Sequence, residues 1–231
     1  MSRRRTLIMG RHQHDAGQRI KTGRLRATMR HPNTRALHAY WSKLRGMEPA
    51  PARSAIDPAA IAGLLSDTFI LEDIGPADYP FRLAGTRLCH HFGRELKGRN
   101  FLGFWAANDI EPIATLMAAV THDAAAAVLD VAMSNDRGQS TRAEMILLPL
   151  RCGPARYDRI LGLVAPMERA SWLGLHPVVR QSANNLRLIW PDRKDEFGVT
   201  PAARPVASRP VPFPLNGRRH HHLVVFDGGR Q

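Results

Sequence analysis

The chain has 231 residues, of which 44% are hydrophobic, and its 33 Lys and Arg against 20 Asp and Glu give a formal net charge of +13. This hydrophobic share is typical of a chain with a packed core and excludes disorder over the whole length. Two cysteines are too few for a disulfide framework or a four-cysteine zinc site, and no run reaches the ~18 apolar residues of a membrane-spanning helix, so we expect a protein of the reducing cytoplasm.

The positive charge gathers at the N-terminus, where residues 1–28 carry seven Arg and one Lys against a single Asp. Because no apolar period runs through this stretch, we predict that residues 1–29 form a basic, disordered arm. Contact with nucleic acid or an anionic lipid surface is an alternative use of such an arm. A third alternative is that translation starts at Met29 and the arm is a leader.

An amphipathic helix is predicted from Asn33 or Thr34, either of which can cap it, to Gly46. Its apolar side chains follow the i, i+3, i+4, i+7 spacing of one helix face. They are Leu37, Tyr40, Trp41 and Leu44. A second, short helix is predicted after Asp57, because a carboxylate cap followed by proline is a helix start signal.

A hairpin is predicted next, because the segments 68–73 and 81–84 are rich in strand formers and flank a turn. A short helix is expected over residues 86–92, closed by the glycine that follows it. An irregular stretch then leads to the longest helix of the chain.

This long helix is predicted from Asn108 to about His122, because Asn108 and the Glu three residues on have the form of a capping box. Three strands are expected after it, at 127–133, 141–150 and 159–165. Two strands, then helices, then three strands predict an α+β fold, a five-stranded antiparallel sheet with helices on one face.

The last two predicted strands are apolar in both of their alternating sets of side chains, over 143–150 and 160–164. A half-exposed antiparallel strand should alternate instead, so both faces of the sheet must be covered. The N-terminal amphipathic helix, from this chain or from a second copy, is the natural cover for the second face. We therefore predict a homodimer or partner interface that includes Leu37, Tyr40, Trp41 and Leu44.

After about Trp172 the periodic pattern weakens, and five prolines fall between residues 201 and 214. We therefore predict that the domain covers residues 30–175 and that residues 176–231 form a Pro-rich basic tail. No kinase, cyclase, phosphodiesterase or helix-turn-helix pattern is visible, so a signal would have to pass to a separate protein.

Five stretches resemble a bacterial PAS family, the fifth PAS family, which was formerly a domain of unknown function. They are YWSKLRG (40–46), PARSAIDP (51–58), FRLAGTRLCHHFGRELKGRNF (81–101), EMILLPL (144–150) and RILGLVAP (159–166). The resemblance covers roughly residues 30–175. It implies a sensory or regulatory module that binds small molecules between the sheet and the long helix, or other proteins through the sheet and flanking helices.

Cofactor signals are present but incomplete. Gly98-Arg99-Asn100 resembles the start of the flavin-binding stretch of light-oxygen-voltage PAS domains, yet Phe101 stands where flavin adduct chemistry needs a cysteine. His122 could serve a haem, but a histidine that complements a helix C-terminus explains it as well. Consecutive residues cannot all face one ion, so neither Cys89-His90-His91 nor 220–222 predicts a metal site. We expect no flavin, no haem and no metal.

Catalytic patterns are also lacking, because the sequence has no nucleophile elbow, no GxxxxGK phosphate loop and no HExxH motif. Asp130 and Glu144 lie in apolar strands, where a carboxylate is more often ion-paired than catalytic. Arg82 is predicted to face away from its strand neighbours, either toward solvent or toward a carboxylate. We expect that the protein is not an enzyme.

The apolar side chains that a PAS arrangement would bring together form a candidate ligand site. They are Phe69, Leu71, Phe81, Leu83, Phe104, Trp105, Ile113, Leu116 and Met117. Such walls suit a small apolar ligand, and the alternative is a filled core. We predict a non-catalytic PAS-type sensory or regulatory module that acts through protein–protein contact. The alternative is a nucleic-acid-binding protein that uses the basic arm and tail.

Overall fold

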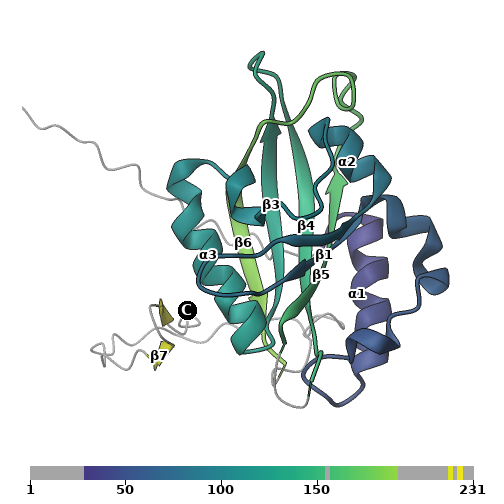
Figure 1. Cartoon of the computed structure of the whole chain (residues 1–231), viewed down its shortest axis with the longest axis vertical. Helices are drawn as coiled ribbons and strands as arrows, with labels where there is room; N and C mark the ends of the chain where they lie inside the picture. Colours follow the sequence, from purple (N-terminus) through teal and green to yellow (C-terminus); the bar gives the residue numbers. More distant parts are fainter. Residues whose placement is uncertain (1–28, 154–156, 192–217, 221–222, 226–231) are drawn as a thin grey trace, which may run out of the picture.

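The structure, a computed structural model, describes residues 29–153, 157–191, 218–220 and 223–225. Six antiparallel strands form one sheet between two helices, α1 (Pro32–Arg45) and α3 (Ala107–His122), which lie on opposite sides of it (Figure 1). We call the face under α1 the outer face and the face under α3 the inner face. Among the described residues, no helix is long and apolar enough to cross a membrane.

The strand order in the sheet is β2-β1-β5-β4-β3-β6. The strands are β1 (Thr68–Glu72), β2 (Phe81–Ala84), β3 (Ala126–Ser134), β4 (Ser140–Leu150), β5 (Arg159–Pro166) and β6 (Arg180–Ile189). The α+β class and the five predicted strands are therefore confirmed. A separate pair, β7 (Arg218–His220) and β8 (Leu223–Val225), completes the described strands.

The sixth strand, β6, corrects the prediction of five strands. Its sequence, RQSANNLRLI, does not alternate, because an edge strand is covered only in part and needs little apolar surface. Its ladder with β3, from Ser134 opposite Arg180 to Ala126 opposite Ile189, holds it in the sheet. The sheet therefore continues beyond residue 175, into the segment predicted as tail.

The helices mostly follow the sequence pattern. Besides α1 and α3, the described residues form α2 (Thr86–Phe92) and three 3-10 helices, η1 (Arg53–Ala55), η2 (Ala59–Asp67) and η3 (Phe101–Phe104). The caps differ from the prediction. His31 caps α1, its Nδ1 accepting from the Asn33 N–H at 3.1 Å. Helix α3 starts after Ala106, without a side-chain cap from Asn108.

Helix α1 of this same chain covers the outer face, as predicted for a cover from this chain or a second copy. Leu37 is fully buried and Trp41 is 3% exposed, while Tyr40 and Leu44 pack at the border of the outer cluster. The indole Nε1 of Trp41 donates to the carbonyl of Pro149 on β4 at 2.8 Å. Apolar burial and one hydrogen bond thus fix the helix on the sheet.

Candidate functional site

Eight of the nine predicted ligand-site residues meet in one buried cluster on the inner face. They are Phe69, Leu71, Phe81, Phe104, Trp105, Ile113, Leu116 and Met117, and each is at most 9% exposed. We call these residues, with their buried neighbours from the sheet, α2, η3 and α3, the inner cluster. The predicted convergence of the hairpin, the irregular stretch and the long helix is therefore present.

Leu83 is the exception, because it is 45% exposed. Leu71 pairs with Phe81 and Ile70 pairs with Leu83, so Arg82 is one extra residue in β2. This β-bulge turns Leu83 toward the outer face, where Ile70 lies, although simple alternation would keep it beside Phe81. Arg82 itself pairs with the carboxylate of Glu72, the structural role expected for it.

The inner cluster is filled by its own aromatic rings. The Phe69 ring lies 5.5 Å from that of Phe81 and 5.9 Å from that of Phe101, and Phe81 lies 5.9 Å from Phe104. A Cβ placed on Gly162 of β5 would lie 2.1 Å from the Phe69 ring. The ring therefore occupies the space that a side chain on the central strand would otherwise fill, and the arrangement is that of a packed core.

Phe101 has a central part in this filling. It stands where the light-oxygen-voltage pattern has its cysteine, it is 1% exposed, and its ring centroid lies 5.6 Å from that of Trp105. The neighbouring Asn100 holds the local turn, because its Oδ1 accepts from the N–H groups of Tyr79 and Leu102 at 3.2 and 3.1 Å. Asn100 of the Gly-Arg-Asn motif thus has a local structural role.

A larger side chain in place of Met117 tests whether the inner cluster is fully packed. Met117 is fully buried on α3, so Met117→Trp should overpack the cluster and lower the free energy of unfolding by about 1–3 kcal/mol. Urea denaturation of the variant and its parent would measure the difference. A variant with unchanged stability that loses a bound small molecule would instead reveal a ligand cavity.

Two carboxylates on the outer face fasten the start of α1. Glu144, which is 3% exposed, accepts from the N–H groups of Arg30 and His31 at 2.8 and 2.9 Å, and from the hydroxyl of Thr34. Asp130, opposite it on β3, pairs with the Arg30 guanidinium at 2.7 Å and with an arginine of β4. The pKa of Asp130 is lowered: burial alone would raise it, but the two arginines outweigh that effect.

The histidines have different surroundings. His122 ends α3, as predicted. Within the described ranges, no group of three or more His, Cys, Asp or Glu side chains could hold a metal ion. His91 is 7% exposed, and burial, with smaller effects of His90 and Arg87, lowers its pKa from 6.5 to about 4. The motif 220–222 lies partly outside the described residues.

The buried His91 predicts a stability change with pH. Its folded pKa is lower than its unfolded pKa, so below about pH 6.5 the unfolded chain binds more protons and the folded state loses stability. The loss from this one group should reach roughly 2–3 kcal/mol between pH 7.5 and pH 4.5. The slope of unfolding free energy against pH across this range should be clearly shallower for His91→Asn than for the parent. His90→Asn, at an exposed neighbour that makes only a smaller contribution to the His91 pKa, should keep a slope close to the parent's.

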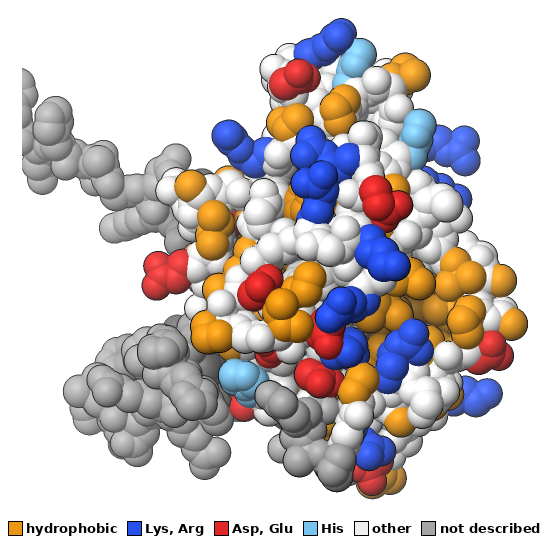
Figure 2. Space-filling model, in the orientation of Figure 1, with side chains coloured by type: hydrophobic (Ala, Val, Ile, Leu, Met, Phe, Trp, Pro, Cys, Tyr) orange, Lys and Arg blue, Asp and Glu red, His pale blue; other side chains and the backbone are white. Residues whose placement is uncertain are grey.

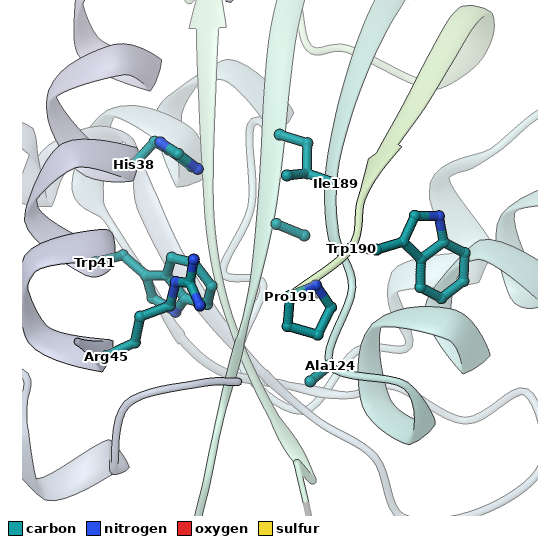
Figure 3. A pocket seen from close by; sticks show the side chains of 8 residues that line it. His38, Trp41, Arg45, Ala124, Ile189, Trp190 and Pro191 are labelled. Atoms are coloured by element: carbon teal, nitrogen blue, oxygen red, sulfur yellow. The ribbon is translucent and has the colours of Figure 1, made fainter. Parts of the chain in front are cut away.

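The small hollow between α1 and the end of β6 can hold no organic ligand. Figure 3 shows His38, Trp41 and Arg45 on one side and Ile189 on the other, with the Trp190 indole pointing away from α1. Its volume is about 10 Å³, room for about one water molecule.

A larger groove lies on the surface, between the segment that follows α2 and the residues that precede β6. Its volume is about 460 Å³, within the range of ligand-binding pockets. It is lined by Arg94, Gly98, Arg99, Asn100, Gly103, Phe104, Val178 and Val179. Figure 2 shows Lys and Arg side chains spread over much of the visible face of the protein.

Sequence analysis did not find this groove. Its two walls are 74 residues or more apart in the chain, and Val178 and Val179 lie in the part predicted as tail. The one signal available was the irregular stretch from Arg94 to Gly103, which contains three basic residues and two glycines. The predicted interface residues Leu37 and Trp41, by contrast, are buried against this chain's own sheet.

The fold defines a PAS-type α+β domain, and the side chains of its inner cluster are closely packed. A family model described as a PAS domain matches residues 29–165, more than half of the chain, and the chain therefore belongs to the fifth PAS family. No curated protein matches the chain.

Solved PAS structures resemble the chain distantly. A PAS domain of an HTR-like protein from Haloarcula marismortui is 17% identical, with 47% of this chain and 90% of that one covered and a TM-score of 0.36. The light-oxygen-voltage protein of Rhodobacter sphaeroides is 14% identical, with 51% and 73% covered and a TM-score of 0.36. A light-oxygen-voltage domain studied with a flavin analogue is 15% identical, with 48% and 84% covered and a TM-score of 0.38.

Proposed function

We propose that this chain is a non-catalytic PAS-type sensory or regulatory module that acts through contact with another protein in the cytoplasm. The filled inner cluster is the observation that carries the proposal. Phe69 lies against Gly162 and Phe101 packs beside Trp105, so the usual space for a ligand between sheet and long helix holds side chains. Under this proposal the domain receives or passes its signal at its surface.

The carboxylates favour the same proposal. Glu144 and Asp130 are the acidic groups that an enzyme could have used on the central strands, and both hold the start of α1. A general base has to reach a substrate proton, which these engaged side chains do not. The free thiols of Cys89 and Cys152 agree with a reducing compartment.

The partner is a separate signalling protein in this proposal. A homodimer that uses Leu37 and Trp41 would have to lift α1 from its own sheet, since both side chains are buried there. Such a move would expose the apolar outer face and break the hydrogen bond from Trp41 to Pro149.

Native mass spectrometry of the full chain, purified from the organism that encodes it, tests the proposal. We expect the polypeptide without a bound small molecule and, at low activation energy, a complex with a second polypeptide. A stoichiometric small molecule that departs only on unfolding would contradict the filled interior. Absence of any polypeptide complex at physiological concentration would contradict the contact.

Nucleic-acid binding through the arm and tail remains the alternative; residues 1–28 of the arm and residues 192–217, 221–222 and 226–231 of the tail lie outside the described residues. DNA binding that weakens with salt and is lost on deletion of residues 1–28 would favour it. Under our proposal the deletion leaves the polypeptide complex intact.

A further inference from the structure

The surface groove beside η3 has the chemistry of a docking site. We propose that the groove binds an acidic segment of the partner protein, in which Asp or Glu side chains alternate with apolar ones. This inference rests on the proposed function. The groove combines two arginines with an apolar wall, and charge complementarity selects the acidic partner.

Arg94 and Arg99 supply the charge. The Nε of Arg94 donates to the carbonyl of Phe92 at 3.3 Å, and the Nε of Arg99 donates to the carbonyl of Glu95 at 3.1 Å. Each bond uses one donor and steadies the side chain, which leaves the fork of terminal N–H groups for a carboxylate. Both arginines are exposed, and no carboxylate of the described residues forms an ion pair with either of them.

The apolar wall comes from the other side of the groove. Val179 is 44% exposed, and Val178 and Phe104 are buried but also line the groove. An exposed valine beside buried apolar groups provides a surface on which an aliphatic side chain of the partner can be buried from water.

The groove is preorganised, because hydrogen bonds hold both walls to the domain. Val178 N–H donates to His91 carbonyl at 2.8 Å, and Val179 N–H donates to Ser134 carbonyl at 2.9 Å. On the facing wall, Gly98 N–H donates to Phe81 carbonyl at 2.8 Å. A bound peptide would therefore order little of the domain, which lowers the entropic cost of binding.

Glycines keep the groove open. A Cβ on Gly103 would meet no atom within 4 Å, and Gly103 needs no left-handed backbone conformation. A side chain introduced there enters open space at the groove without a clash, so Gly103→Leu should occupy the groove and spare the fold.

Fluorescence anisotropy with a labelled twelve-residue peptide in which Glu alternates with Leu tests the proposal on the full chain. We expect binding that weakens as salt is raised, and a matched peptide with Gln in place of Glu should bind at least about tenfold more weakly. Arg99→Glu and Gly103→Leu should each raise the Kd of the acidic peptide about tenfold or more.

Two matched controls separate groove binding from nonspecific effects. Lys43→Glu makes the same charge change on the exposed side of α1, across the sheet from η3, and Gly63→Leu adds the same side chain at another open glycine. Both should leave the Kd within about twofold, and circular dichroism should show all four variants folded. Equal effects of Lys43→Glu and Arg99→Glu, or tighter binding of a single-stranded oligonucleotide in the groove, would overturn the proposal.

The two proposals fail differently. If the mass-spectrometric complex with a second polypeptide forms but survives Arg99→Glu and Gly103→Leu, the protein contact stands and the groove is not its site. If neither the complex nor peptide binding is found, the contact itself is wrong.

Discussion

Gly162→Ala is expected to lower the free energy of unfolding by about 3 kcal/mol or more, at or above the upper end of the range for overpacked cores. The new Cβ would lie 2.1 Å from the ring of Phe69, far inside van der Waals contact. The ring cannot withdraw, because Phe81 and Phe101 pack against it at centroid distances of 5.5 and 5.9 Å. Urea denaturation at neutral pH measures the loss.

The double variant Gly162→Ala/Phe69→Leu is the control for this prediction. Phe69→Leu alone removes ring volume from the core and should destabilise the domain. In combination with Gly162→Ala, the smaller Leu side chain makes room for the new methyl group. The loss of unfolding free energy in the double variant should therefore be smaller than the sum of the two single losses by at least about 1 kcal/mol. Additive changes would mean that the Phe69 ring does not lie over Gly162.

Trp41→Ala is expected to cost about 3–5 kcal/mol of unfolding free energy, the usual loss for a truncated buried aromatic side chain. Trp41 is 3% exposed between α1 and the sheet, and its Nε1 donates to the Pro149 carbonyl at 2.8 Å. Thermal and urea denaturation would both report the loss. Because the contact lies within one chain, the oligomeric state in sedimentation should not change.

Trp41→Phe separates the two parts of this effect. It keeps most of the apolar area but loses the donor to the Pro149 carbonyl, so it should cost about 1–3 kcal/mol, less than the alanine variant. A Trp41→Ala protein of unchanged stability but altered oligomeric state would show that α1 is exchanged between copies.

Local sequence patterns were sufficient to predict most of the helices and strands of the fold. The i, i+3, i+4, i+7 spacing of Leu37, Tyr40, Trp41 and Leu44 placed one helix face correctly, because such spacing depends only on helix geometry. The doubly apolar strands β4 and β5 correctly indicated that both sheet faces are covered.

The failures arose where structure depends on contacts distant in sequence. β6 is polar and irregular, and only its ladder with β3 makes it a strand. The bulge at Arg82 turned Leu83 away from the inner cluster, which no alternation rule anticipates.

The candidate site was partly predictable for the same reason. The convergence of Phe69, Phe81 and Met117 followed from the fold, but whether they enclose a cavity depended on Gly162 and Phe101, whose roles appear only in three dimensions. The surface groove joins Arg99 to Val179 across 80 positions of the chain, and no sequence motif connects them.

Xenon titration of the methionine methyl groups tests the filled interior most directly. Met117, Met133 and Met145 all lie in the inner cluster and are at most 1% exposed, and Met47, fully exposed, serves as the reference. Xenon enters apolar cavities of protein interiors. In protein labelled with carbon-13 at the methionine methyls, we predict that the three buried resonances shift no more than that of Met47 as xenon pressure rises. A saturable shift confined to the buried three would reveal a cavity between the sheet and α3 and contradict the account.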